Sequence, residues 1–179
     1  MKPLNKREVQ KSYDELGGRL YNLRYEEEQS RKYNAAILLT LPKRDDLLLD
    51  NGCGTGMFLR RLDSPCVGLD FTAVVLSDAK QKLKLNHHLV KGDSEHLPFR
   101  KRIFQGIYAI TLIQNLPDKE SAISEMKRVS KAQSTLFITA LKVAFSKEYL
   151  AVLLERNRFS KVDFIGDAGT NDWIACIQS

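Results

Sequence analysis

The sequence predicts an α/β protein with a doubly wound, mostly parallel sheet of seven strands and a helical cap at its N-terminus. From Asp46 onward, short apolar runs alternate with segments of helical periodicity, which is typical of parallel strands buried on both faces. Residues 1–44 carry no strand pattern. The last two apolar runs lie only eight residues apart, too few for a helical crossover, so the final strand should be antiparallel.

The N-terminal part is predicted to be helical. Val9, Tyr13 and Leu16 recur at helical spacing, and a second helix is expected from about residue 20 to 41, because Pro42 would end it. The length fits one domain. We therefore expect a single domain over residues 1–179, with a cap over 1–44 and an α/β core over 45–179.

The seven predicted strands, in chain order, are Leu47–Leu49, Cys66–Leu69, His88–Val90, Gly106–Ile110, Leu136–Ile138, Val162–Phe164 and Trp173–Ile177. The predicted helices between them are a short one around Phe58–Leu62, Ala73–Leu83 with Val74, Val75 and Ala79 inward, one that carries Ala122, Met126 and Val129, and Tyr149–Leu154. Asp118 precedes the third of these and is expected to cap it.

Composition and charge limit the class of protein. The chain has 179 residues, is 43% apolar and carries a formal net charge of +6, which suits a globular protein and permits anionic partners. Its three cysteines form no CxxC pair, so neither a disulfide framework nor a zinc site is expected. No secretory signal or membrane span is recognisable, and a cytoplasmic location is expected.

The most informative segment is the glycine loop from Asp50 to Gly56, which follows the first strand and opens a helix. A tight turn without a ligand is one reading. A dinucleotide fingerprint would need its third glycine one residue later, and a phosphate loop would need Gly-Lys-Ser/Thr. An acid before the glycines would repel a phosphate, so it suits a ligand with an ammonium group.

Two further acids follow the next two strands. Asp70 lies where an acid accepts hydrogen bonds from both hydroxyls of a ribose. Asp93 ends the third strand and is suited to accept from an exocyclic adenine amine. Acids at three consecutive strand ends indicate an adenosine with a cationic tail.

These residues resemble a known family. Asp-x-Gly-x-Gly-x-Gly at 50–56, Gly68–Phe71, Gly92–Phe99 and Phe104–Asp118 are similar to motifs of class I S-adenosylmethionine-dependent methyltransferases. They are closest to the type 11 branch, which includes ubiquinone and menaquinone biosynthesis enzymes and wobble-uridine tRNA methyltransferases. The resemblance covers about residues 46–140. It implies a Rossmann-like fold and S-adenosylmethionine as cofactor.

The resemblance also assigns cofactor-binding residues. The implied set is Asp50, Gly52, Cys53, Gly54 and Gly56 around the methionine moiety, Asp70 at the ribose, Phe71 beside the adenine, Asp93 and Ser94 at the adenine edge, and the backbone of Ala109 and Ile110 at the methionine ammonium group. Three positions depart from the family pattern: Asn51 replaces an aliphatic residue, Gln105 an aspartate, and Gln114-Asn115 a frequent His-His pair.

No catalytic residue can be assigned from the sequence. The substrate-side candidates are Tyr13, Arg24, Gln114 and Asn115. Tyr13 and Arg24 resemble the cap of the type 11 enzymes, although helix packing is an equal reading of Tyr13. Packing is favoured over nucleophilic catalysis for Cys53. No His/Cys/Asp/Glu cluster has metal-ligand spacing, so no metal is expected.

The predicted function is S-adenosylmethionine-dependent methyl transfer, with RNA of tRNA type as the expected acceptor. Residues 80–102 hold seven basic side chains against two acidic ones, and Arg100-Lys101-Arg102 is suited to contact phosphates. A partner protein or homodimer would then supply further surface. The alternatives are a small-molecule methyltransferase and a non-catalytic cofactor-binding or scaffold subunit.

Overall fold

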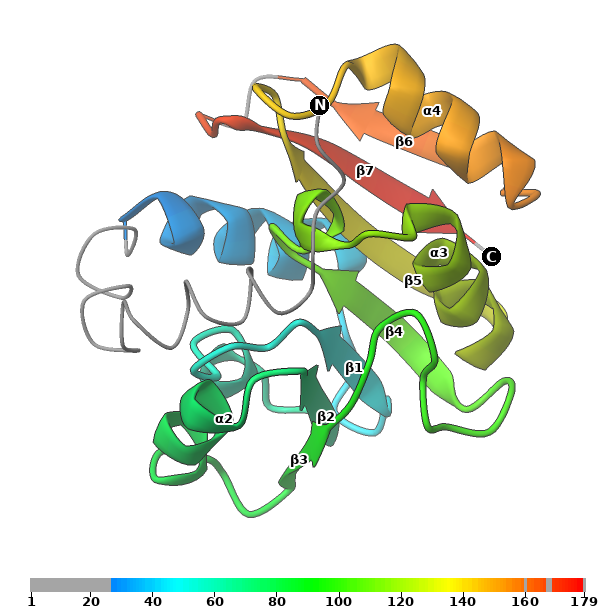
Figure 1. Ribbon diagram of the computed structural model, residues 1–179. Helices are drawn as coiled ribbons and strands as arrows, with labels where there is room; N and C mark the ends of the chain where they lie inside the picture. Colours follow the sequence, from blue (N-terminus) through cyan, green and yellow to red (C-terminus); the bar gives the residue numbers. More distant parts are fainter. Residues whose placement is uncertain (1–26, 160, 167–168, 179) are drawn as a thin grey trace.

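A computed structural model describes residues 27–159, 161–166 and 169–178 (Figure 1). One seven-stranded sheet runs through these residues in the order β3-β2-β1-β4-β5-β7-β6. The strands are β1 (Leu48–Asn51), β2 (Cys66–Asp70), β3 (His87–Lys91), β4 (Phe104–Ala109), β5 (Ser130–Leu141), β6 (Lys161–Ile165) and β7 (Asp172–Gln178). The first five pair in parallel, while β7 is antiparallel to both of its neighbours. The predicted fold class is confirmed.

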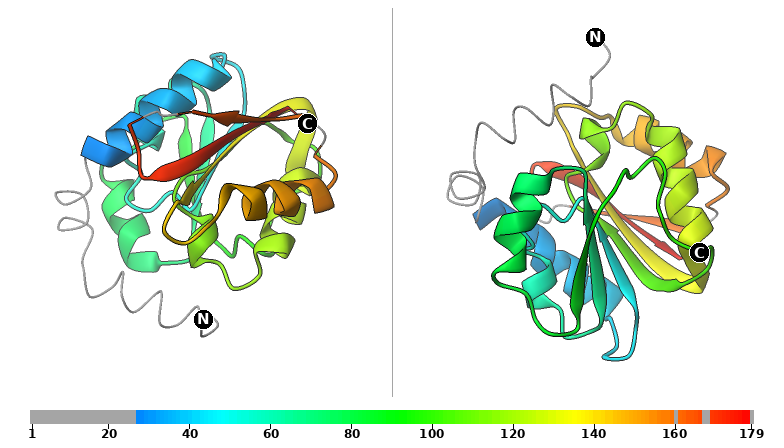
Figure 2. Two further views of the ribbon diagram at one scale, coloured as in Figure 1. Left: turned by 90° about the horizontal axis from the view of Figure 1, so that it is seen from above. Right: turned by 60° about the horizontal axis from the view of Figure 1, so that its bottom comes forward.

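Helices cover both faces of the sheet (Figure 2). They are a helix over residues 27–40, α2 (Ala73–Lys80), α3 (Lys119–Val129) and α4 (Lys147–Arg156), with short 3-10 helices η1 (Leu59–Arg61) and η2 (Ile113–Asn115). The helix over 27–40 and α2 lie on one face, and α3 and α4 lie on the other. This is the arrangement that a doubly wound sheet requires.

Alternating side chains along the strands explain the two cores. Leu48 and Tyr108 pack under the helix over 27–40, whereas their neighbours Leu49 and Ile107 pack under α3 and α4. Because successive residues of a strand point to opposite faces, an apolar run without alternation buries both faces. The continuous apolar strands of this sequence therefore need helices on each side.

Most predicted elements are present, with shifted ends. The helix before Pro42 ends at residue 40, and Leu41 turns the chain with a φ of 44°. The helix expected around Phe58–Leu62 is only the 3-10 turn η1, and α2 stops at Lys80. Asp118 does cap α3, because its carboxylate accepts from Ser121 N at 3.0 Å.

One inward assignment on α2 was wrong. Val74 is 48% exposed, while Val75, Leu76 and Ala79 are buried. The helix touches the sheet along a narrow stripe of positions three and four apart, and Val74 falls one position off that stripe.

The parallel strands place the functional candidates at one edge. The glycine loop, Asp70 and Asp93 follow the carboxyl ends of β1, β2 and β3, which meet at the same edge of the sheet. This is where open α/β sheets bind ligands. Among the residues described, no helix has the length and apolar character needed to cross a membrane.

Candidate functional site

The glycine loop is fastened to the neighbouring strand by its own backbone. The amides of Gly52 and Cys53 both donate to the Leu69 carbonyl, at 2.8 and 3.0 Å. Gly52, Gly54 and Gly56 have φ values of 83°, 51° and 71°, in the left-handed region that disfavours side chains. A Cβ at Gly52 would lie 2.9 Å from Leu112 Cδ1, while one at Gly54 would meet nothing within 4 Å. The loop therefore closes against Leu112 and opens at Gly54.

Asp50 is a buried acid with an oxygen that makes no hydrogen bond. Asp50 is the last residue but one of β1 and is 3% exposed, and its Oδ2 has no hydrogen-bond partner. Burial, and then the nearby negative charge of Asp70, raise the pKa of Asp50 to about 8. An unsatisfied buried carboxylate is unfavourable unless a ligand completes it. A ligand that brings a cationic donor would do so.

Asp70 joins the glycine loop to α2. Its Oδ2 accepts from the Gly54 amide and its Oδ1 accepts from the Thr72 amide, both at 2.9 Å. Burial raises the pKa of Asp70, and these two amides act in the opposite direction. Hydrogen bonds from the Thr72 side chain and the Phe71 backbone also lower this pKa. The ring of Phe71, 40% exposed, follows directly.

The segment after β3 is held by short-range contacts. Asp93 Oδ1 accepts from the Glu95 amide at 3.0 Å. The Ser94 hydroxyl donates to Asn51 Oδ1 at 2.8 Å and is buried. This pair gives the unusual Asn51 a role, since it links the ends of β1 and β3. The hydroxyl hydrogen of Ser94 is therefore committed to the protein, and only its lone pairs or its backbone remain for an adenine edge.

The end of β4 forms the other wall of the site. Ala109 is buried, and Ile110 leads into Thr111, whose carbonyl accepts from Gln114 Nε2 at 2.6 Å and Asn115 Nδ2 at 3.3 Å. Gln114 is 8% exposed, and its Oε1 has no hydrogen-bond partner. The Gln-Asn pair thus shapes this turn.

Cys53 is a packing residue. A Cβ added at Gly68 would lie 2.8 Å from Cys53 Sγ, so the thiol fills the space that this glycine leaves. Burial, with the negative charge of Asp50 second, raises the pKa of the Cys53 thiol well above its usual range. A thiol that stays protonated is a poor nucleophile.

The two substrate-side candidates of the predicted cap, Tyr13 and Arg24, lie outside the described residues. His87 is buried at the opposite end of β3, and His96 is an exposed side chain 3.8 Å from an oxygen of Asp93. Within the described ranges no three His, Cys, Asp or Glu side chains are grouped as a metal site would require.

The basic residues also lie mainly away from the site. Arg100, Lys101 and Arg102 precede β4, and the Arg102 amide donates to the Arg128 carbonyl at the end of α3. Lys84 precedes β3 and pairs with Asp63 at 2.7 Å. Parallel strands start at the edge opposite to the one where they end, so these side chains lie at the far edge from the glycine loop.

Three residues that the sequence did not single out lie beside this edge: Lys32, Thr111 and Asp172. Lys32 is buried and its Nζ is 2.8 Å from Asp172 Oδ1. The only sequence signal was a lysine on the same helical stripe as the buried Tyr33 and Ala36.

Comparisons with known proteins agree with this geometry. Residues 49–138, half of the chain, match the family model described as a methyltransferase domain. The demethylmenaquinone methyltransferase of Thermotoga maritima is 28% identical over 144 residues, covering 78% of this chain and 62% of that protein. The malonyl-[acyl-carrier protein] O-methyltransferase of Yersinia pestis is 31% identical over 98 residues, covering 53% and 36%. The chain thus spans only part of the curated relatives it matches.

The fold has solved counterparts as well. A structure of the Haloferax volcanii Trm112 methyltransferase activator in complex with a methyltransferase superposes with a TM-score of 0.74 at 15% identity, covering 88% of this chain and 93% of that chain. At that identity the likeness shows the fold. Together with the family match, it confirms the resemblance seen in the sequence: this chain belongs to the methyltransferase domain family, whose fold and sequence imply S-adenosylmethionine as cofactor.

Proposed function

We propose that this protein transfers the methyl group of S-adenosylmethionine to a small-molecule acceptor. The observation that carries the proposal is the buried carboxylate of Asp50, which lacks a partner at Oδ2, next to the open space at Gly54. The α-ammonium group of the cofactor would complete Asp50, and the space at Gly54 would admit its methionine chain. Burial makes such a charge-assisted hydrogen bond strong.

The other assignments follow the strand order. Asp70 would accept from the ribose hydroxyls, and Phe71 would lie against the adenine. Asp93 and Ser94 would face the adenine edge, and the backbone of Ala109 and Ile110 would face the methionine end. Gly52, Cys53 and Gly56 would shape the loop without donating side-chain chemistry. In this assignment the methionine, ribose and adenine parts of the cofactor are each bound by residues at the carboxyl ends of the parallel strands.

When bound, the cofactor supplies a methyl group on a positively charged sulfur, which is already activated for transfer. The protein then has to align the acceptor and exclude water, and alignment is a large part of such catalysis. Gln114 is a substrate-side candidate within the described residues, and its buried Oε1 has no hydrogen-bond partner. It would accept a hydrogen bond from a hydroxyl or amine of the acceptor.

A small acceptor is favoured over RNA by the position of the charges. The Arg100-Lys101-Arg102 triplet, which suggested phosphate contacts, lies at the amino edge of β4, away from the glycine loop. An RNA whose phosphates were bound by this triplet would have its bases far from the predicted cofactor site. Relatives named for demethylmenaquinone and for a malonyl group on a carrier protein point in the same direction.

Two measurements test the proposal. Calorimetry should detect one molecule of S-adenosylhomocysteine per chain, with strong loss of affinity in Asp70→Ala and none in Asp163→Asn, an exposed carboxylate on β6. A transfer assay with methyl-labelled cofactor should then label a metabolite extract. Label in total RNA instead would overturn the small-molecule acceptor, and label in neither, despite cofactor binding, would favour a non-catalytic subunit.

A further inference from the structure

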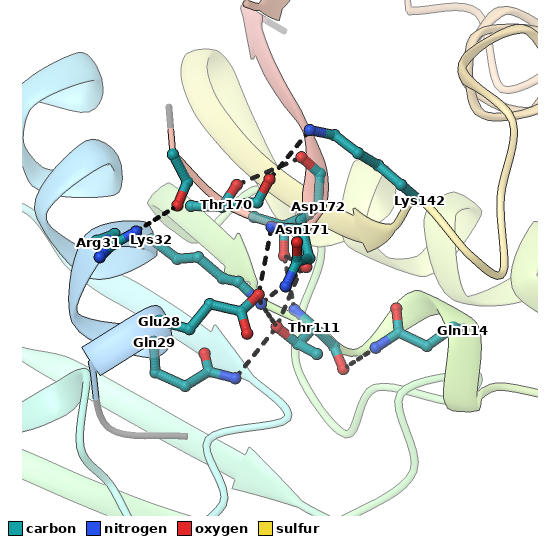
Figure 3. A network of polar contacts seen from close by, with 12 residues as sticks. Glu28, Gln29, Arg31, Lys32, Thr111, Gln114, Lys142, Thr170, Asn171 and Asp172 are labelled. Carbon is teal, nitrogen blue, oxygen red and sulfur yellow. Dashed lines mark hydrogen bonds and ion pairs between the residues drawn. The ribbon is translucent and has the colours of Figure 1, made fainter. Parts of the chain in front are cut away.

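A buried ion pair joins the helix over residues 27–40 to β7 (Figure 3). Lys32 is 1% exposed, and its Nζ lies 2.8 Å from Asp172 Oδ1. Glu28 Oε1 is a second carboxylate oxygen near Lys32, at 3.4 Å. Lysine is almost never buried unless it is paired. Burial of both charges requires desolvation that the pair only partly offsets, so such a pair is weak evidence for stability and needs another reason.

The pair converges on Thr111, at the carboxyl edge of the sheet. Lys32 Nζ donates to Thr111 Oγ1 at 3.0 Å, and that hydroxyl donates to Asp172 Oδ2 at 3.3 Å. The Thr111 amide donates to Thr139 Oγ1 at 2.8 Å, and Thr139 in turn donates to Asp172 Oδ2 at 2.7 Å. The Asp172 carboxylate thus holds the Thr111 hydroxyl directly and the Thr111 amide through Thr139, and Lys32 neutralises that carboxylate.

Thr111 needs this support because its backbone is strained. Its φ of 58° lies in the left-handed region, where a β-branched residue is an outlier. Such residues persist only when their surroundings determine them, and they concentrate at functional sites. The contacts of Thr111 with Lys32, Thr139 and Asp172 provide that determination.

The conformation of Thr111 determines how the residues before and after it lie in the wall of the proposed cofactor site. Ala109 and Ile110 precede it, and Leu112 follows it. The Leu112 side chain lies where a Cβ on Gly52 would meet it at 2.9 Å, so it closes the glycine loop. A change at Thr111 would therefore move Leu112 relative to Gly52.

We infer that Lys32 is a positioning residue: it acts through Thr111 to hold the wall of the cofactor site, and so couples cofactor affinity to the buried contact between Lys32 and Asp172. This inference rests on the proposed function. The polar contacts of Lys32 are with Glu28, Thr111 and Asp172, none of which belongs to the predicted cofactor-binding set. Its influence passes along the contact from Nζ to the Thr111 hydroxyl.

The neighbouring Arg31 offers a matched control. It lies on the same helix and also reaches the chain before β7, since Arg31 Nη1 donates to the Gly169 carbonyl at 2.9 Å. It pairs with Glu27 at 2.7 Å on the surface. Neither of these two contacts involves Thr111. Arg31→Met therefore removes a cation and a tie between the same two segments without touching the proposed route.

The experiment compares Arg31→Met and Lys32→Met by calorimetry with S-adenosylhomocysteine and by hydrogen exchange at the Thr111 amide. We expect Arg31→Met to match the wild type. Lys32→Met should bind about tenfold more weakly, within the range for mutations that act through an intermediate element. Its Thr111 amide should exchange faster.

Two double variants keep the test sharp if Lys32→Met alone unfolds. Lys32→Met/Asp172→Asn removes both buried charges, so it should regain much of the thermal stability while its affinity stays weak. Lys32→Met/Thr111→Gly should bind as Thr111→Gly alone does, because glycine adopts a positive φ without support.

Two outcomes would overturn the inference. In one, Lys32→Met/Asp172→Asn recovers both stability and wild-type affinity, and the pair is then only structural. In the other, the loss from Lys32→Met persists unchanged in the Thr111→Gly background. Failure of the wild type to bind S-adenosylhomocysteine would instead overturn the proposed function, and the exchange rates at Thr111 would still decide whether Lys32 holds this segment.

Discussion

At the scale of single residues, Asp50 governs the behaviour of the site with pH. Its folded pKa of about 8 is far above the ordinary value of 3.8, because burial and Asp70 disfavour its charged form. An acid whose pKa is higher in the folded than in the unfolded state binds its proton more tightly when the protein is folded. Its contribution to the free energy of unfolding is therefore present at low pH and is lost as pH rises from about 4 to about 8.

Two pH effects are expected from this sign. The cofactor-free protein should lose thermal stability between pH 5 and pH 8, and Asp50→Asn should make its stability less dependent on pH.

Affinity for S-adenosylhomocysteine should rise toward pH 8, with a proton released on binding, since the ammonium group needs the charged carboxylate. Calorimetry in buffers of different ionisation enthalpy measures the proton directly. Proton release unchanged in Asp50→Asn would assign it to Asp70, whose pKa burial also raises.

Substitution of Gly54 should affect folding stability and cofactor affinity for different reasons. A methyl group there would meet no protein atom within 4 Å, so Gly54→Ala carries mainly the backbone penalty of a left-handed alanine, roughly 1–2 kcal/mol. The same methyl would occupy the space proposed for the methionine chain. Overpacking of a filled site costs roughly 1–3 kcal/mol, which lowers affinity about 5- to 150-fold.

Thermal unfolding and calorimetry on Gly54→Ala check both parts. Gly166→Ala is the control, because that glycine is equally open and has no positive φ. A Gly54→Ala protein that binds S-adenosylhomocysteine as well as the wild type would show that the space at Gly54 is not part of the cofactor site.

At the scale of elements, local signals explain where α3 begins. Asp118 accepts from the Ser121 amide at 3.0 Å and from its hydroxyl at 2.7 Å. Loss of an N-cap costs about 1 kcal/mol, so Asp118→Ala should lower stability by that amount. Urea unfolding measures the change. Cofactor affinity should be unchanged, since α3 covers the face opposite to α2; reduced affinity at equal stability would mean that the cap also orders the site.

The ends of other elements were less accessible from the sequence. The helical pattern of α2 continued to Leu83, but the helix stops at Lys80, and Leu83 packs against the core from beyond the turn that follows it. Periodicity shows which residues are apolar but not how long the neighbouring surface is. The Asp118 cap, in contrast, was predictable, since it depends on residues three apart.

At the scale of the whole molecule, binding and folding should be coupled. A ligand that binds only the folded chain stabilises it by ~2.7 kcal/mol when its concentration is about 100 times its Kd. For a chain of this size that raises Tm by roughly 5–10 °C. Thermal scans with S-adenosylhomocysteine should show this shift in the wild type and much less of it in Asp70→Ala. Equal shifts in the two proteins would place the ligand elsewhere.

Charge shows how sequence and structure divide the information at this scale. The excess of basic residues over 80–102 was visible in the sequence, and the expectation that it faces an RNA acceptor followed from its closeness to Asp93 in the chain. The structure places Arg100-Lys101-Arg102 at the amino edge of β4 instead. Residues a few positions apart lie at opposite edges when a loop returns the chain to the start of a parallel strand.

The sequence by itself determined the strands, the glycine loop and the acids after three strand ends, because each depends on neighbours within a few positions and on the rule that parallel strands end at one edge. Only the tertiary structure decided that Lys32 meets Asp172, that Ser94 is committed to Asn51, and that Thr111 is held in a left-handed conformation. These contacts join residues distant in the chain. Their energies come from burial and mutual distance, and no local pattern encodes either.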